Sequence, residues 1–295
     1  MKLIIKKLLA TSLSRVGPYC PAGWLEDVLL LRLSSYLMDE RVLPRRAVPR
    51  PLRGTNAMLL CNPYIPTHKR LFWCGRLEQR AIESYLRREL RPGDTFIDVG
   101  SNYGHLSILA SFLVGKAGRV IAFDANEPLA NVLSDYCKGC ELQNVRVYAV
   151  GLGDAEVNDD LLVDPKYPGQ SFVRGAAREA DGDRSQVVRC AIQKGDRALQ
   201  GKDLPGRVCL KVDVEGYEIR VLKGLAEILA KSVDHAIVEV SPQWIGGAAG
   251  VCELIAIMRN AGFKPYPLRA DGRIGSELST SAVERQVDVI FRKEK

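Results

Sequence analysis

Two glycines, four residues apart, stand where a short apolar segment gives way to a helical one. Gly100 and Gly104 follow the predicted strand 95–99, with Asn102 between them. Glycine has no side chain and tolerates positive φ, so the backbone of such a loop can approach a ligand closely. At a helix N-terminus the loop suits a dinucleotide phosphate or a nucleoside with a charged tail. Because the middle glycine of the dinucleotide fingerprint is missing, a nicotinamide cofactor is disfavoured. Gly100, Asn102 and Gly104 are therefore candidate cofactor-binding residues.

Aspartates on both sides of this loop favour a nucleoside cofactor that carries a cation. Asp98, two residues before Gly100, would repel a pyrophosphate but could hold an amine. Asp124 ends the next predicted strand, where a carboxylate can accept hydrogen bonds from both ribose hydroxyls. Together they point to S-adenosylmethionine, and Asp154 joins them as a candidate cofactor-binding residue. The alternative is that Asp98 only caps the loop and Asp124 only ends a strand.

A second group of carboxylates follows a later predicted strand. Asp213 and Glu215 are two residues apart, so they project to the same side while the chain stays extended. Such a pair could orient a substrate hydroxyl, take its proton or hold a divalent cation, and Glu215 is the candidate substrate or metal ligand. The alternative is a cluster that favours the start of a helix, which we prefer for Glu218. Lys211 is interpreted as structural.

These residues need a sheet that brings several strand ends to one edge. Strands and helices alternate beyond residue 76, which predicts a mostly parallel sheet covered on both faces. In such sheets ligands bind beyond the carboxyl ends of the strands, at the switch point. The predicted strands are 95–99, 119–123, 145–150, 207–212, 235–240, 263–268 and 287–291. The predicted helices are 76–90, 103–114, 126–140, 217–231 and 251–260.

The fold class that follows is α/β: a doubly wound, Rossmann-like sheet with an antiparallel C-terminal strand, over residues 76–295. Residues 151–195 lose their periodicity and are expected to be an insertion or a set of short strands, and 246–250 a glycine-rich connector or gate. Residues 1–75 are expected to form a small N-terminal helical extension and a proline- and arginine-rich linker at 40–70. A helix at 24–38 could touch a membrane surface, although packing on its own core is favoured.

Composition narrows the partners and the compartment. The net charge of +7 is spread along the chain without a run of five like charges, and no basic and aromatic platform for nucleic acid appears. No transmembrane segment is expected, and Lys6 and Lys7 interrupt the N-terminal apolar run before it reaches signal-peptide length. Eight scattered cysteines predict reduced thiols and a cytoplasmic protein. Cys137 and Cys140 lack a second pair that would complete a zinc site, and are interpreted as helix-end cysteines.

Several of these segments carry a family resemblance. They are Pro-Gly-Asp at 92–94, Phe-Ile-Asp-Val-Gly-Ser-Asn-Tyr-Gly at 96–104, Val-Ile-Ala-Phe-Asp at 120–124, Leu-Lys-Val-Asp-Val-Glu-Gly-Tyr-Glu at 210–218, Val-Leu-Lys-Gly at 221–224 and Ile-Val-Glu-Val at 237–240. Over about residues 76–292 the chain resembles the FkbM-type S-adenosylmethionine-dependent methyltransferases. It departs from them at His105 and at Asp124-Ala125-Asn126, where an aromatic residue and Glu-Pro-Asn are expected.

The resemblance implies a small hydroxylated acceptor, a sugar or a natural product, because members of that family methylate such hydroxyls. In-line transfer depends mainly on positioning the acceptor oxygen, and a base helps when that oxygen is a neutral hydroxyl. Asp213 is the first candidate base, with Glu239 and His105 behind it. Two rivals remain, a methyltransferase of nucleic acid and a non-catalytic cofactor-binding or scaffold protein. A divalent metal and the oligomeric state are left open.

Overall fold

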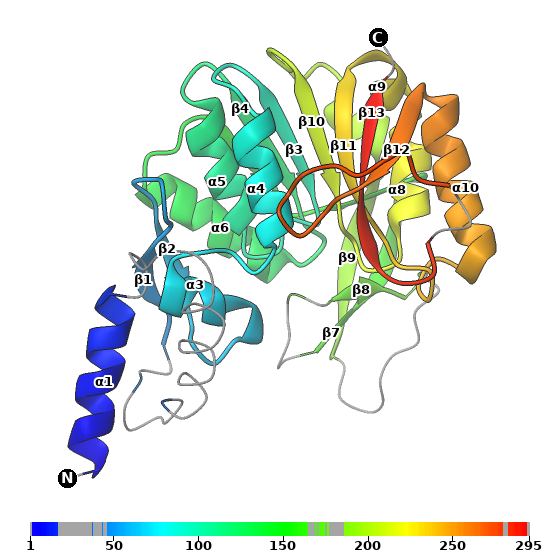
Figure 1. Cartoon of the computed structure of the whole chain (residues 1–295). Coiled ribbons are helices and arrows are strands. Elements are labelled where there is room, and N and C mark those ends of the chain that lie inside the picture. Colours follow the sequence, from blue (N-terminus) through cyan, green and yellow to red (C-terminus); the bar gives the residue numbers. More distant parts are fainter. Residues whose placement is uncertain are drawn as a thin grey trace. The chain divides into compact units, whose positions relative to one another are not determined.

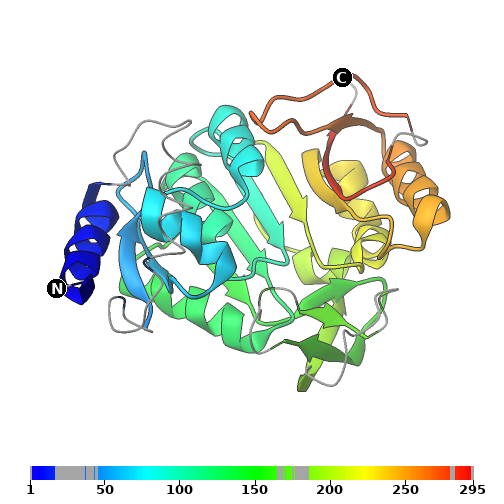
Figure 2. The same cartoon turned by 60° about the horizontal axis from the view of Figure 1, so that its bottom comes forward.

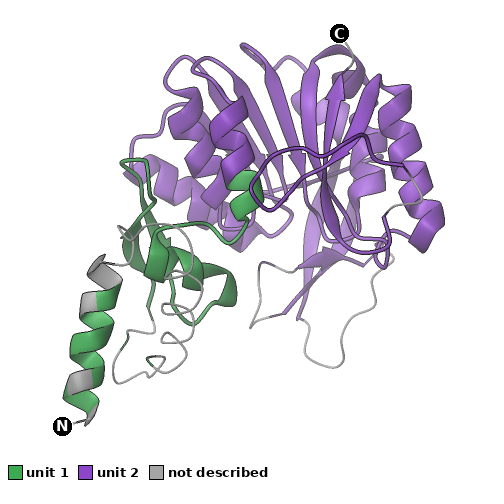
Figure 3. Cartoon of the chain, in the orientation of Figure 1, with its two compact units in different colours: residues 1–83 green, residues 84–295 purple. Residues whose placement is uncertain are grey.

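The chain divides into two compact units, residues 1–83 and 84–295 (Figure 3). The computed structural model describes residues 2–16, 37, 43, 46–164, 169, 171–174, 176, 186–279 and 283–293. The predicted helix at 24–38, apart from Leu37, lies outside these residues. Helix α4 (Arg80–Glu89) spans the boundary between the units and begins four residues later than the predicted helix.

The first unit contains two short strands within the stretch that we expected to be a linker. Strand β1 (Val48–Pro51) pairs antiparallel with β2 (Met58–Cys61), and a 3-10 turn (Pro66–His68) leads into α3 (Lys69–Cys74). Proline is tolerated here because each strand of a two-stranded ribbon has one edge without a ladder partner. Helix α1 (Lys2–Val16) completes the unit and contacts α3.

A seven-stranded sheet organises the second unit, in the order β12-β13-β11-β10-β3-β4-β5 (Figure 1). Its members are β3 (Thr95–Val99), β4 (Arg119–Phe123), β5 (Val145–Tyr148), β10 (Val208–Val212), β11 (Val233–Val240), β12 (Phe263–Pro267) and β13 (Val287–Lys293). The five consecutive strands from β11 to the edge strand β5 are parallel, and β13 runs antiparallel to both β11 and β12. The mostly parallel sheet with an antiparallel C-terminal strand is therefore confirmed.

Helices cover both faces of this sheet. Alternate strand residues, such as Ile97, Leu210 and Val238, belong to the apolar core that also includes Leu222, Leu229 and Leu254. Those last three lie on α8 (Glu218–Gly224), α9 (Ala226–Lys231) and α10 (Gly247–Asn260). The opposite face carries Asp98, whose carboxylate is bonded by Ser107 of α5 (His105–Val114). Helix α6 (Glu127–Gly139) contacts β5, and α5 contacts β3 and β4.

The insertion forms a second sheet of four short strands, in the order β6-β9-β7-β8. They are β6 (Gly151–Gly153), β7 (Val157–Val163), β8 (Phe172–Val173) and β9 (Gln186–Lys194), followed by helix α7 (Gly195–Leu199). Figures 1 and 2 place this light-green sheet beside the edge at which the parallel strands end. The prediction of short strands in 151–195 is confirmed.

Two local predictions were wrong. The expected connector at 246–250 is largely helical, because α10 begins at Gly247 after Gly246 takes φ 91°. Gly250 sits against the preceding turn, where an added Cβ would lie 1.7 Å from the Ile245 carbonyl oxygen. The single helix expected at 217–231 is instead two helices, α8 and α9, which meet at Leu225. Both features depend on packing that local periodicity does not report.

The sequence predicted reduced cysteines and no transmembrane segment. Each cysteine within the described ranges is a free thiol, and Cys137 and Cys140 lie at the C-terminal end of α6 as interpreted. Cys20 falls outside those ranges. Among the described residues, no helix has the length and apolar character needed to cross a bilayer.

Candidate active site

The glycine loop connects the end of β3 to the start of α5 and takes three left-handed residues to do so. Gly100, Asn102 and Gly104 have φ of 78°, 55° and 75°. A Cβ on Gly100 would lie 1.9 Å from the Asp213 carbonyl oxygen, and one on Gly104 would lie 2.2 Å from Leu133. Both positions therefore require glycine for chain packing as well as for its backbone freedom. Helix α5 has no side-chain cap of its own, because its N-cap residue is Gly104, whereas Asn102 Oδ1 accepts a hydrogen bond from the Tyr103 N–H within the loop.

Asp124, which follows β4, fixes this loop from the neighbouring strand. Its Oδ2 accepts a hydrogen bond from the Asn102 N–H at 2.6 Å, and its Oδ1 accepts one from the Asn126 N–H at 2.8 Å. Burial raises the pKa of Asp124 to about 6, against the opposing effect of these two bonds. Each carboxylate oxygen retains a second lone pair, so the residue can still accept a bond from a ligand hydroxyl.

Asp98 is fully buried and takes part in a charge cluster at the ends of two strands, β3 and β10. Its Oδ2 accepts a hydrogen bond from the Ser107 hydroxyl at 2.6 Å, and its Oδ1 lies 3.2 Å from Lys211 Nζ. Lys211 Nζ also donates to the Gly100 carbonyl at 3.0 Å and pairs with Asp213 at 3.5 Å. Burial lowers the pKa of Lys211, but the two carboxylates outweigh it and leave that pKa above its ordinary value. Lys211 therefore joins the ends of β3 and β10 to the glycine loop.

A row of three carboxylates crosses the same edge of the sheet. Asp213 directly follows Val212, which pairs with Val238, and the next residue on β11 is Glu239, which pairs with Asp288 of β13. Burial, followed by repulsion from Asp213, Glu215, Glu218 and Asp288, raises the pKa of Glu239 to about 9. Burial and Asp213 likewise raise the pKa of Asp288 to about 6. The row thus holds more negative charge than Lys211 compensates, and Glu239 retains its proton at neutral pH.

Polar neighbours fix the Glu239 carboxyl in place. Gln286 donates a hydrogen bond from Nε2 to Glu239 Oε1, and the Ser241 hydroxyl donates to Oε2 at 3.4 Å. Ser241 is buried and Gln286 is exposed. The carboxyl therefore lies between a buried donor and a surface donor.

The turn after β10 contradicts the expectation that Asp213 and Glu215 share one side of an extended strand. Strand β10 ends at Val212, and Glu215 has a left-handed φ of 56°. The carboxylate of Glu218 holds this turn by accepting hydrogen bonds from the N–H groups of Val214 and Gly216. Burial raises the pKa of Glu218 to about 7, and the residue starts α8 as preferred from the sequence.

The remaining candidates lie around this centre at different places in the fold. His105 is the first residue of α5, half-buried, with its ring stacked on that of Tyr103 at a centroid distance of 6.1 Å. Asp154 follows β6 and pairs with Arg220 at 3.5 Å. The inserted segment also approaches the loop, because Asn102 Nδ2 donates to the Gly169 carbonyl at 3.1 Å and Asn126 Nδ2 donates to the Ser171 hydroxyl at 3.1 Å.

Sequence reasoning missed Asp288 and Ser101. Asp288 joins the row only because β13 runs back beside β11, and an alternating segment near the C-terminus does not show that register. Ser101 lies in the glycine loop with a buried hydroxyl that has no hydrogen-bond partner within the described part of the chain. A buried polar atom without a partner is costly, so a ligand group that bonded Ser101 Oγ would be favoured. The residues of the loop therefore fit a polar nucleoside cofactor.

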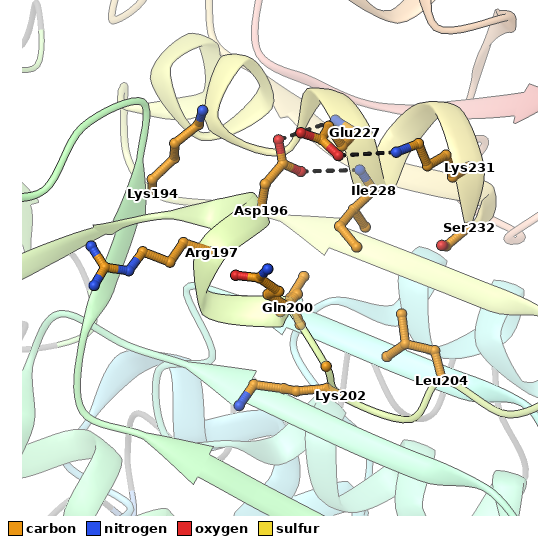
Figure 4. Close-up of a pocket in the computed structure, with 12 residues that line it drawn as sticks. Lys194, Asp196, Arg197, Gln200, Lys202, Leu204, Glu227, Ile228, Lys231 and Ser232 are labelled. Carbon is orange, nitrogen blue, oxygen red and sulfur yellow. Dashed lines mark hydrogen bonds and ion pairs between the residues drawn. The ribbon is translucent and has the colours of Figure 1, made fainter.

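Two further features bear on ligand binding, the arrangement of metal-ligating residues and a pocket away from the glycine loop. No group of three or more His, Cys, Asp or Glu within the described ranges is arranged to hold a metal ion. A pocket of about 550 Å³ lies between α7 and α9 (Figure 4). In it Asp196 accepts the N–H groups of Glu227 and Ile228 and so caps α9. None of the sequence-predicted site residues lines this pocket.

Comparison with known proteins identifies the family of this chain. The family model "Methyltransferase FkbM domain" matches residues 98–265, more than half of the 295-residue chain. "AMB antimetabolite synthetase AmbE" of Pseudomonas aeruginosa is 26% identical over 210 residues, which cover 59% of this chain and 10% of that protein. "Hexuronic acid methyltransferase AglP" of Haloferax volcanii is 28% identical over 168 residues, which cover 56% of this chain and 63% of that protein. The matches thus span less than two thirds of these relatives.

A solved structure with the same family name is only distantly similar. The methyltransferase FkbM of Methylobacillus flagellatus KT is 12% identical, with a TM-score of 0.44, over 71% of this chain and 50% of that one. At this TM-score the likeness adds nothing to the match of the family model. That match, together with the glycine loop and the acidic strand ends within it, shows that the chain belongs to the FkbM methyltransferase domain family, whose cofactor is S-adenosylmethionine.

Proposed function

We propose that this protein is an S-adenosylmethionine-dependent O-methyltransferase that acts on a hydroxyl of a sugar or secondary metabolite. The observation that carries the proposal is the carboxylate row Asp213, Glu239 and Asp288 at the same sheet edge as the glycine loop, with Asp213 and Glu239 inside the part of the chain that matches the methyltransferase domain. The name of the relative AglP, a hexuronic acid methyltransferase, supports a sugar as the acceptor.

The proposed cofactor-binding residues are those that surround the loop. When bound, S-adenosylmethionine supplies a methyl group on a positively charged sulfur, ready for in-line displacement. The backbone of Gly100, Asn102 and Gly104 lets a ligand approach closely, and Asp124 has lone pairs left for the ribose hydroxyls. Asp98 and Asp213 together carry two negative charges beside the single positive charge of Lys211. The remaining negative charge would attract the cationic amino group of S-adenosylmethionine. Asp154 remains in the set as a residue beyond β6.

Asp213 is the best of the three candidate bases. It lies 3.5 Å from Lys211, which stabilises its negative charge, and it lies half-buried at the end of β10. Glu239 is less suited at neutral pH, because its raised pKa leaves it protonated, so we assign it a hydrogen-bond donor role toward the acceptor. His105, stacked on Tyr103 at the start of α5, remains an alternative base on the other side of the loop. Glu215 remains a candidate to orient the substrate, since it lies close enough to Glu239 to raise that residue's pKa.

Calorimetry with S-adenosylmethionine tests the cofactor site first. Asp124→Asn should weaken binding by about tenfold to a hundredfold, because a charged hydrogen-bond acceptor is lost. Asp124→Glu should retain more of the binding, and the exposed Asp135→Asn on α6 is the matched control. If the wild-type chain released no heat on titration, the scaffold alternative would replace the enzyme.

Methyl transfer is tested separately from binding. With hexuronic acids and neutral hexoses as acceptors, mass spectrometry should detect the gain of one methyl group. Asp213→Asn should keep cofactor affinity and lower the transfer rate by about a hundredfold or more, as expected when a general base is removed. Transfer that was unaffected in Asp213→Asn would remove this residue from the mechanism and leave His105 as the base.

A further inference from the structure

The carboxylate row Asp213, Glu239 and Asp288 lies on one face of the sheet. Glu239 and Asp288 are register partners on the antiparallel strands β11 and β13, so their side chains project to the same face. Lys211 is the register partner of Ile237, two residues before Glu239, and therefore shares that face. Asp213 shares it as well, since its carboxylate lies 3.5 Å from Lys211 Nζ. Because neighbouring strands are about 4.8 Å apart, the row extends for about 10 Å away from the glycine loop.

Asp288 is the member of the row that has no role so far. It lies beyond residue 265, where the match to the family model ends. Its side chain is half-buried, and its carboxylate makes no hydrogen bond or ion pair with any residue that the structure describes. Lys211, whose charge acts on it, already pairs with two other aspartates. Both carboxylate oxygens of Asp288 can therefore accept hydrogen bonds from a ligand.

Glu239 places a hydrogen-bond donor beside this acceptor. Its raised pKa of about 9 leaves a proton on the carboxyl at neutral pH, whereas Asp288, with a pKa of about 6, is ionised. A donor and an acceptor on neighbouring strands match two adjacent hydroxyls, because a hydroxyl can both donate and accept. An ammonium group fits less well, since it has no lone pair to accept the proton of Glu239.

The charge of Asp288 also bears on which acceptors are excluded. A carboxylate on the acceptor, held about 6 Å from Asp288, would be repelled by an amount that lowers its affinity by about tenfold at a partly exposed site. A neutral hydroxyl at the same place would instead donate a hydrogen bond to Asp288. The same residue can therefore attract one class of acceptor and repel another.

We propose that Asp288 is a positioning and specificity residue for the acceptor. Together with Glu239 it binds hydroxyls adjacent to the one that faces Asp213, and it selects neutral polyhydroxyl acceptors, such as hexoses, over hexuronic acids. This role rests on the proposed methyl transfer, because it takes the sheet edge beside the glycine loop as the place where the acceptor binds.

Binding of acceptors in the presence of S-adenosylhomocysteine tests the proposal without requiring turnover. Ligand-observed NMR titrations would compare the methyl glycosides of glucose, galactose and mannose with the matching hexuronides and 2-amino sugars. At neutral pH the wild type should bind at least one neutral glycoside about tenfold more tightly than its hexuronide.

Two variants of Asp288 separate its charge from its hydrogen bonds. Asp288→Asn should raise the affinity for the hexuronide by about tenfold and change that for the neutral glycoside by no more than about threefold, because only the charge is lost. Asp288→Ala should weaken binding of the neutral glycoside by about tenfold or more, because a hydrogen bond to a charged group is lost. A gain of affinity for the hexuronide is not an effect that partial unfolding produces.

The matched control is Asp203→Asn, which alters an exposed aspartate that pairs with Arg119 and should leave both affinities unchanged. The proposal is overturned if the wild type binds neither class, if it binds hexuronides as tightly as neutral glycosides, or if Asp288→Asn leaves their ratio unchanged. It is also overturned if an amino sugar binds most tightly, since the row would then recognise an amine. Selective binding without methyl transfer would contradict the proposed function alone, whereas methyl transfer with unselective binding would contradict the role of Asp288 alone.

Discussion

At the scale of single residues, the site is a balance between one buried cation and several carboxylates. Sequence spacing predicted that Asp98, Asp124 and Asp213 lie at the ends of strands on one edge of the sheet, and the structure adds that these strands, β3, β4 and β10, are neighbours. It could not predict that Lys211 is shared between Asp98 and Asp213, because that pairing depends on the register between β3 and β10. Short-range spacing thus located the charges, whereas their compensation is a tertiary property.

The first prediction concerns Glu239, whose pKa is raised to about 9 by burial and its acidic neighbours. Glu239 binds its proton more tightly in the folded state than in the unfolded chain. The proton therefore contributes to the free energy of unfolding in full below the ordinary glutamate pKa, and this contribution is lost as pH rises toward 9. Glu239→Gln removes the charge and can still accept a bond from Gln286. The variant should therefore be more stable than the wild type at pH 9, by several kcal/mol, about 6 at most, with little difference at pH 5.

Denaturant unfolding at the two pH values measures this effect. The surface residue Glu227, paired with Lys231 on α9, gives the matched control Glu227→Gln. That control should not gain stability at alkaline pH, because its carboxylate has a cationic partner. Equal stability of Glu239→Gln and the wild type at pH 9 would show that repulsion within the carboxylate row is unimportant.

At the scale of elements, apolar runs bounded by glycine and aspartate correctly predicted the strands of the sheet. The wrong helix bounds occur where the backbone is closely packed. Strands β3 and β4 have the predicted bounds. Near the break at Leu225, a Cβ on Gly224 would lie 1.7 Å from the Gly153 carbonyl oxygen of β6, and at the start of α10 Gly250 lies equally close to Ile245 in the preceding turn. Such close approaches leave no periodic pattern in the sequence.

The second prediction tests one of these approaches, at Gly250 in the first turn of α10. Gly250→Ala places a Cβ 1.7 Å from the Ile245 carbonyl oxygen, so the backbone must shift and the protein should lose about 1–3 kcal/mol of stability. Gly139→Ala is the matched control, since Gly139 ends α6 and an added Cβ meets nothing within 4 Å. The control should be neutral or stabilising by up to about 1 kcal/mol, because alanine favours helix. Urea unfolding of both variants decides, and equal effects would contradict the packing explanation.

At the scale of the whole molecule, opposite sets of buried groups limit stability at the two ends of the pH range. The raised pKa values of Glu239, Glu218 and Asp288 make the folded state of the second unit less stable as pH rises. On the acidic side the limit is His235 of β11, which packs against Tyr85 of α4, with its Nδ1 2.8 Å from the Tyr85 hydroxyl. Stability should therefore be greatest at mildly acidic pH, before Asp288, Glu218 and Glu239 ionise in turn.

His235 provides the last prediction, for acid unfolding. Burial lowers its pKa to about 4, more than Glu89 restores, so the folded state holds a neutral imidazole while the unfolded chain takes up a proton below the ordinary histidine pKa. The neutral His235 therefore contributes to the free energy of unfolding in full above the ordinary histidine pKa. This contribution, about 3 kcal/mol, is lost as pH falls toward 4. His235→Gln should unfold less steeply between pH 7 and pH 4, measured by melting temperature against pH. His105→Gln, at a half-buried site, is the control, and an unchanged slope for His235→Gln would assign the acid limit to other groups.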